Sequence, residues 1–467
     1  MLQKLGFLPG FNKQVTSTGA ESQWTGGENV RFRYGTPEKI GGWAQLGSAS
    51  LCGATRALHH MVNKTSIKYA ILGTNRILYA YTGSVYYDIH PIKTDFGALT
   101  NKLACTSGSP ILTITLSSTS GMTAGDILFL ENVTPPTGSG YSAVDFDDKT
   151  FMITSVVNST SVTITMGSNA SASATDGDLS VKYYYPVGPV EQVGAYGYGI
   201  STFGGDSLGA ITTTLNGSLS DNAFGTGGSG TTITLASVSG LPTTGINYIL
   251  VGTEEISYTG VVGSTITGIT RAVAGTRSAH ASGASVEVYL GWGSASLTGG
   301  VTLESASWSL DHFGSKLIAT IKDGKTFEWD TISNAPAALT TRATVVSGAP
   351  TKSVMSIVSE RDRHLVILGT ETTIGTSNTQ DKMFIRFSDQ ENISDYAPTS
   401  VNTAGTFRID SGTKIVGAVR GKDYILILTD TSAYVMQFVG PPFTFSIRQV
   451  GSNCGAIGQH SIKYVNG

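Results

Sequence analysis

The chain has 467 residues, with 30 basic and 33 acidic side chains and a formal net charge of −3. It shows no block of like charge, so strong direct binding of DNA or RNA, which normally needs a basic patch, is disfavoured. Charged residues make up 13% of the chain and hydrophobic residues 40%, a balance that excludes a disordered chain. The 58 glycines, with scattered Thr, Val, Ile and Tyr, favour a turn-rich, all-β fold.

The three cysteines are odd in number and far apart, at Cys52, Cys105 and Cys454. They predict neither a disulfide framework nor a metal site, and they are typical of a chain folded in a reducing cytoplasm. The opening MLQKLGFLPGFNK is too broken by Pro and Gly for a signal peptide. No window approaches the roughly 18 apolar residues of a membrane helix, so no membrane-spanning segment is expected.

The first predicted strand covers residues 30–34. Val30, Phe32 and Tyr34 would share one face of it and Arg31 and Arg33 the other, which is the alternation of a half-buried strand.

We single out Arg31, Arg33 and the nearby Trp43 as a candidate contact surface for a partner or another subunit. Arg and Trp are enriched at interface hot spots. The plainer alternative is an exposed strand face with a tryptophan that caps the local core.

A strand–turn–strand phrase then recurs at irregular spacing. It begins with KYAILGTNRILYAYTGSVYYDI at 68–89 and returns at 315–330, 364–389 and 422–439. Short strands joined by tight turns and interrupted by long insertions predict a β-propeller whose blades carry extra domains, and this chain need not contain all of its blades.

Two Ser/Thr-rich stretches interrupt these phrases and look like copies of one module. The first contains ITLSSTSGMTAGDILFL from Ile114 and the second ITLASVSGLPTTGINYILV from Ile233. We interpret them as two inserted small β-sandwich-like domains. The predicted organisation is an N-terminal arm and first strand (1–50), a propeller blade region (51–98), inserted domain 1 (99–186), a return segment (187–207), inserted domain 2 (208–291) and a second blade region (292–467).

The sequence ends in the middle of a predicted blade. Residues 460–465 read as the first strand of another blade, and Asn466-Gly467 as a hairpin turn. Our hypothesis is that the chain is a truncated product, the product of a split gene or one part of a longer polypeptide. The blade count therefore stays open.

Two patterns suggest ligand sites but fit plainer structures better. Residues 225–230 match G-x-G-x-x-G, yet TTITLAS follows; this is a strand and not the helix that a dinucleotide site needs. Asp145, Asp147 and Asp148 lack the glycine and glutamate of a calcium loop, so we predict a solvated turn.

The histidines also predict no catalytic or metal site. His59 and His60 lie on a predicted strand and point to opposite faces, so they cannot bind one metal together. Asp311-His312 could belong to an active site, but no nucleophile pairs with it. We expect no enzyme activity, no cofactor and no metal.

The phrase FLPGFNKQVTSTGAESQWTGGENVRFRYGTPEKIGGWAQL at 7–46 resembles a recurrent opening of certain short-tailed phage proteins. The blade phrases at 68–81 and 423–438 and SDQENISDYAP at 388–398 resemble the same group. The family is called tail nozzle, tail tubular protein B or packaged-DNA stabilisation protein.

The resemblance implies a β-propeller subunit of a virion tail, assembled in the host bacterial cytoplasm as a homo-oligomeric, sixfold ring. The ring would lie below the portal and its adaptor, contact tail fibres or other tail proteins, retain the packaged DNA and conduct it during ejection without sequence-specific binding.

Two other functions remain open. One is a receptor-binding adhesin whose inserts bind carbohydrate, with Tyr141, Tyr248 and Tyr258 as aromatics that could stack on sugars. The other is a propeller hydrolase or lyase. It would need carboxylates, His or Arg converging at one propeller mouth, and the sequence indicates no such cluster.

Overall fold

The computed structural model describes residues 6–42, 50–189, 212–221, 229–288, 305–331, 341–440 and 443–465. These ranges hold strands β1 to β31, and their helical elements are short 3-10 helices such as η1 (Ala143–Asp145). The predicted all-β class is therefore confirmed. By internal contacts the chain divides into two units, Met1–Leu51 and Cys52–Gly467. No helix of the described part is long and apolar enough to cross a membrane.

In the N-terminal unit, β1 (Val30–Arg33) and β2 (Thr36–Lys39) form an antiparallel hairpin. The predicted strand is present, but Tyr34 does not share a face with Val30 and Phe32. Tyr34 and Gly35 both have positive φ, 49° and 82°, which is the geometry of a tight two-residue hairpin turn. The Tyr34 ring is consequently 92% exposed.

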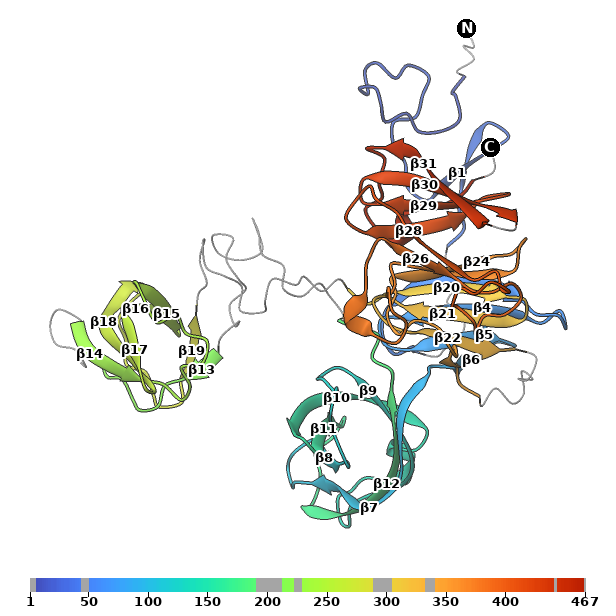
Figure 1. Cartoon of the computed structure of the whole chain (residues 1–467). Coiled ribbons are helices and arrows are strands. Elements are labelled where there is room, and N and C mark those ends of the chain that lie inside the picture. Colours follow the sequence, from blue (N-terminus) through green and yellow to red (C-terminus); the bar gives the residue numbers. More distant parts are fainter. Residues whose placement is uncertain are drawn as a thin grey trace, which may run out of the picture. The chain divides into compact units, whose positions relative to one another are not determined.

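The described part of the second unit contains four antiparallel four-stranded sheets and two inserts (Figure 1). Sheet 1 comprises β3 (Thr55–Val62), β4 (Lys68–Thr74), β5 (Leu78–Thr82) and β6 (Val85–Asp88). Sheet 2 comprises β20 (Trp308–Phe313), β21 (Lys316–Ile321), β22 (Thr326–Asp330) and β23 (Thr344–Val345). Sheet 3 comprises β24 (Met355–Ser359), β25 (His364–Leu368), β26 (Phe384–Phe387) and β27 (Gly405–Arg408). Sheet 4 comprises β28 (Ile415–Arg420), β29 (Ile425–Thr429), β30 (Ser432–Gly440) and β31 (Thr444–Ser452).

Each of the four recurring phrases lies in a different one of these sheets, and each sheet is a simple meander. The local reason is clear in sheet 1. Strands β4 and β5 alternate buried and partly exposed residues, and Gly83-Ser84, both with positive φ, turns β5 into β6. Such turns match the twist of neighbouring strands.

The sheets pack in chain order through their first strands, here called the inner strands: β3, β20, β24 and β28. Strand β20 contacts β3 on one side and β24 on the other, and β24 contacts β28. Between sheets 1 and 2 the core contains Tyr69, Trp308 and Trp329, all at most 1% exposed. Full burial of a large apolar side chain stabilises a fold by roughly 1.5–3 kcal/mol.

Gly73 shows how closely the first two sheets approach. A Cβ atom at this position would lie 2.7 Å from the Trp308 ring, and the indole Nε1 donates a hydrogen bond to the Thr74 carbonyl at 2.9 Å. Only glycine leaves room for this contact.

The first insert is a closed six-stranded barrel, not the predicted sandwich-like domain. Its strands follow the order β10-β11-β8-β7-β12-β9, and β9 pairs with β10 to close the ring (Figure 1). The pairing of β12 with β7 shifts register four times. Bulges of this kind bend strands strongly enough to allow closure. The strands are β7 (Ile92–Cys105), β8 (Ile111–Thr115), β9 (Ile127–Thr134), β10 (Lys149–Asn158), β11 (Ser161–Thr165) and β12 (Ala174–Tyr184).

The second insert is one seven-stranded sheet around its own core, which also differs from two facing sheets. Its path is β13-β19-β15-β16-β18-β14, with β17 paired to β18. The predicted return segment lies outside the described residues beyond residue 189, as do both ends of this insert. The strands are β13 (Thr212–Thr214), β14 (Ser229–Thr234), β15 (Asn247–Val251), β16 (Glu254–Tyr258), β17 (Gly260–Val262), β18 (Thr265–Ala274) and β19 (Ser285–Val288).

The prediction of a strand at residues 460–465 is wrong. The segment begins with the 3-10 helix η5 (Gln459–Ser461) and continues without regular structure to residue 465. It packs against β28, where Ile462 and Gln459 lie close to Gly417. It does not pair with the edge of a described strand. The predicted Asn466-Gly467 turn lies outside the described residues.

Candidate functional site

The two arginines of the predicted contact surface lie on the N-terminal hairpin. Arg31 forms an ion pair with Glu38 across the hairpin, with Nη2 2.7 Å from Oε1. The Arg33 guanidinium lies over the Tyr34 ring, 5.3 Å from its centroid. Trp43 lies outside the described residues. Both arginines therefore have local partners, and their role in binding another protein stays a prediction.

A cluster of histidine, carboxylate and arginine side chains lies where the inner strands end. His59 comes from β3, Asp311 and His312 from β20, Glu360 directly follows β24, and Arg420 is the last residue of β28. All four sheets thus contribute one or more groups. The sequence had indicated no such cluster of converging carboxylates, His and Arg.

These five residues, His59, Asp311, His312, Glu360 and Arg420, are here called the axial cluster. Its central member is Asp311, which is only 4% exposed. Its Oδ2 accepts a hydrogen bond from the Val358 amide at 2.8 Å. Its Oδ1 accepts one from the His312 amide at 2.9 Å and another from Arg420 Nη2 at 2.8 Å. Arg420 also pairs with Glu360. A buried carboxylate with this many donors is well satisfied, and it links sheets 2, 3 and 4.

The two histidines face each other between sheets 1 and 2. His59 Nε2 and His312 Nδ1 are 3.0 Å apart, so one ring donates a hydrogen bond and the other accepts it. Burial lowers the pKa of His59; the Asp311 carboxylate opposes that shift, and the neighbouring His312 and Arg420 side chains reinforce it. His312 Nε2 also lies 3.6 Å from Glu360 Oε1.

One potential metal-binding group in the described part of the chain consists of His59, Asp311 and His312, whose ligand atoms all lie within 4.8 Å of one another. The donor types suit a transition metal. However, both Asp311 oxygens already accept hydrogen bonds and the Arg420 cation touches one of them. The arrangement therefore fits an ion-paired link between sheets better than a cation site.

Sequence reasoning was right that His59 and His60 point to opposite faces, since His59 reaches the cluster and His60 is exposed. It missed the pairing of His59 with His312, which lies 253 residues away. The available signal was that each residue lies in the strand directly before a recurring phrase, β3 before the phrase at 68–89 and β20 before the one at 315–330.

The other two rejected patterns have clear local structures. Asp145 accepts hydrogen bonds from the Ser142 amide and hydroxyl, both at 2.8 Å, and these lower the pKa of Asp145. Asp147 accepts one from the Val133 amide at 2.7 Å. Residues 225–228 of the glycine-rich stretch lie outside the described residues, and Ser229 already begins strand β14, so a strand and not a helix follows it, as predicted.

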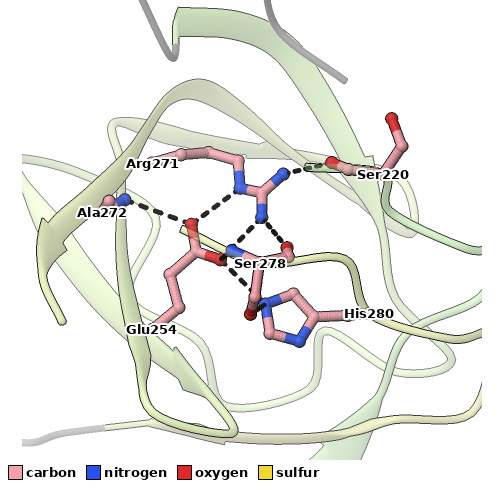
Figure 2. A network of polar contacts seen from close by, with 6 residues as sticks. All are labelled: Ser220, Glu254, Arg271, Ala272, Ser278 and His280. Atoms are coloured by element: carbon pink, nitrogen blue, oxygen red, sulfur yellow. Dashed lines mark hydrogen bonds and ion pairs between the residues drawn. The ribbon is translucent and has the colours of Figure 1, made fainter. Parts of the chain in front are cut away.

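A buried network in the second insert was not foreseen (Figure 2). Arg271 holds the fully buried Glu254 with two hydrogen bonds, 2.8 Å from Nε to Oε1 and 2.6 Å from Nη2 to Oε2. His280 Nε2 lies 2.8 Å from Oε2, and the Ser278 amide donates to the same oxygen at 3.1 Å. Burial raises the pKa of Glu254, but the hydrogen bonds from Arg271, His280 and Ser278 outweigh it and lower this pKa to about 2.

The same network extends to the backbone, because Arg271 donates to the Ser220 carbonyl at 2.6 Å and to that of Ser278 at 2.5 Å. It therefore joins β16, β18 and the segments on either side of them. Both carboxylate oxygens of Glu254 and the Arg271 guanidinium are engaged in hydrogen bonds (Figure 2), so the network stabilises the insert.

Neither a family model nor a curated protein matches the chain. Among solved structures, it is similar to the phage phi92 endosialidase at 12% identity and a TM-score of 0.17, with 88% of this chain and 60% of that chain covered. It is also similar to the extracellular domain of a putative one-component system of B. thetaiotaomicron, at 11% identity and a TM-score of 0.19, covering 91% and 58%. The chain thus spans less than two thirds of either protein, and likenesses at these scores carry no argument about function.

Proposed function

We propose that sheets 1 to 4 are blades of a β-propeller and that the chain is a structural subunit of a short phage tail. The four sheets are consecutive four-stranded meanders packed through their inner strands, which is the plan of propeller blades. All four inner strands also line one cavity of about 470 Å³, with Leu58, Leu310, Ile357 and Val419 among its lining residues.

The observation that carries the functional proposal is that the phrases resembling the tail nozzle family fold into these aligned sheets. Six copies would form a ring that extends the DNA channel below portal and adaptor, retains the packaged genome and conducts it during ejection. Tail fibres or other tail proteins are further partners, and assembly takes place in the host cytoplasm. The role includes no catalytic step, in keeping with an axial cluster whose carboxylates are tied up in ion pairs.

The aromatics considered for the adhesin alternative are poorly placed for stacking on sugars. Tyr258 is fully buried and its hydroxyl donates to the Pro242 carbonyl at 3.1 Å. Tyr141 is half-buried and its hydroxyl donates to the Ser168 carbonyl at 2.7 Å. Tyr248 is 37% exposed and is the remaining candidate of the three.

The test is antibody labelling of particles from the producing culture, viewed by electron microscopy. Label at the tail vertex is the expected result. Label on cells, or on no part of the particles, would contradict the proposal, and glycan-array binding by the chain would then favour the adhesin.

A further inference from the structure

A second cavity, of about 640 Å³, lies at the other end of the inner strands. Its volume falls within the usual range for ligand pockets. All four sheets and the segment around η5 contribute to its wall. Among the described residues that line it, five are basic and none is a carboxylate: Arg56, Lys322, Lys382, Lys414 and His460.

The topology explains why these basic residues converge. Arg56 is the second residue of β3, and Lys414 directly precedes β28. Lys322 directly follows β21, and Lys382 lies two residues before β26. In antiparallel meanders all four positions lie at the end of the sheet where the inner strand begins. The carboxylates Asp311 and Glu360 lie at the opposite end, where the inner strands finish.

Hydrogen bonds and an ion pair hold the wall of this cavity in place. Arg56 Nη1 donates to the Ala306 carbonyl at 2.8 Å, and His460 Nε2 lies 3.2 Å from the Ser307 hydroxyl. Lys382 pairs with Asp323 at 3.3 Å, a carboxylate outside the cavity lining. Burial lowers the pKa of His460, and the positive charge of Lys322 lowers it further, as expected where positive potential accumulates.

We propose that this basic cavity binds a phosphate-rich anion, either a free oligophosphate or the phosphodiester backbone of a nucleic acid strand. A concave wall in which Arg and Lys side chains gather focuses positive potential and attracts counter-charge. Lys and Arg side chains are the usual donors to phosphate oxygens. Ser307 and Ser461 add hydroxyl groups to the wall. This inference stands on the cavity alone and does not depend on the role in a phage tail.

The test is isothermal titration of the full chain at low ionic strength with two probes, tripolyphosphate and a 12-nucleotide single-stranded DNA. Binding of either probe that weakens as salt is added supports the site. Binding of the DNA alone assigns the ligand to a nucleic acid backbone, and binding of tripolyphosphate alone assigns it to free oligophosphates. Failure of both probes to bind would overturn the proposal.

Variants locate the binding. The double change Lys322→Gln and Lys414→Gln is expected to weaken binding at least about tenfold, while Lys102→Gln, on exposed β7 of the barrel, should leave it within about twofold. Lys322→Arg with Lys414→Arg keeps both charges and should retain binding, which separates loss of charge from misfolding. Equal affinity in the Gln and wild-type chains would refute the assignment.

Discussion

At the scale of single residues, the structure rests on a few buried polar side chains whose partners come from distant segments. Asp311 and Glu254 are both nearly or fully inaccessible, and each accepts hydrogen bonds from an arginine and from backbone amides. Breaking such a buried pair leaves a charge without compensation. Substitution of either residue should therefore cost far more than the loss of a surface ion pair.

For the axial cluster, Asp311→Asn should lower the free energy of unfolding by about 1–3 kcal/mol, because Arg420 loses the buried one of its two ionic partners and keeps only Glu360. Denaturant unfolding followed by tryptophan fluorescence measures it, since Trp308 lies at the start of the same strand. The matched control is Asp423→Asn, whose partner Arg361 is 70% exposed in its side chain; this change should cost less than about 1 kcal/mol. Equal losses in the free energy of unfolding in the two variants would show that Asp311 does not link the sheets.

For the second insert, lowering the pH should remove the stabilisation of the fold that the ionised Glu254 side chain provides. Its folded pKa of about 2 lies below the ordinary value of about 4.3 for an unfolded chain. A depressed folded pKa gives stability that is present above the unfolded pKa and is lost as pH falls toward the folded pKa. The protection of amides within residues 229–288 against hydrogen exchange, corrected for the intrinsic exchange rate at each pH, should therefore fall between about pH 4.5 and pH 2.

The variant Glu254→Gln should lose this pH dependence and already exchange faster at neutral pH, because Arg271 is left buried without an ionic partner. Glu255→Gln, one residue along β16 and only half-buried, is the control and should keep the wild-type profile. A wild-type acid response in Glu254→Gln would assign the effect to another group.

At the scale of elements, the segment from Ile457 to Tyr464 separates the two cavities of the inner strands. Residues at its beginning line the basic cavity and residues at its end line the other one, with Gln459 and His460 common to both. Its seat on β28 depends on Gly417, where a Cβ atom would lie 2.7 Å from Ile462 Cδ1 and 3.2 Å from the Gln459 carbonyl. The segment from Ile457 to Tyr464 must shift if Gly417 gains a side chain.

Gly417→Ala should therefore loosen this segment while β28 itself stays folded. Hydrogen-exchange mass spectrometry should show faster exchange in residues 459–464, with little change in the sheet 4 amides. Gly167→Ala is the control, because a Cβ there would meet no atom within 4 Å. If hydrogen exchange in residues 459–464 is unchanged in Gly417→Ala, the segment is not held in place at Gly417.

At the scale of the whole molecule, the proposed role predicts an assembly of six chains. Native mass spectrometry of the full chain should give a species of six subunits of 48.7 kDa each, or a monomer that becomes a hexamer when the portal–adaptor complex is added. A monomer under both conditions would contradict the ring. This outcome is independent of anion binding by the basic cavity.

Sequence patterns were enough to predict the all-β class, the four meander phrases and the strand that follows the glycine-rich stretch, because alternation and turn residues act over a few neighbouring positions. The other features depend on contacts between distant segments. Register shifts between β7 and β12 closed the barrel, and contact with β28 replaced the expected strand at 460–465. The axial cluster and the basic cavity combine residues 250 or more positions apart. Such proximity arises from how sheets pack, and no local pattern encodes it.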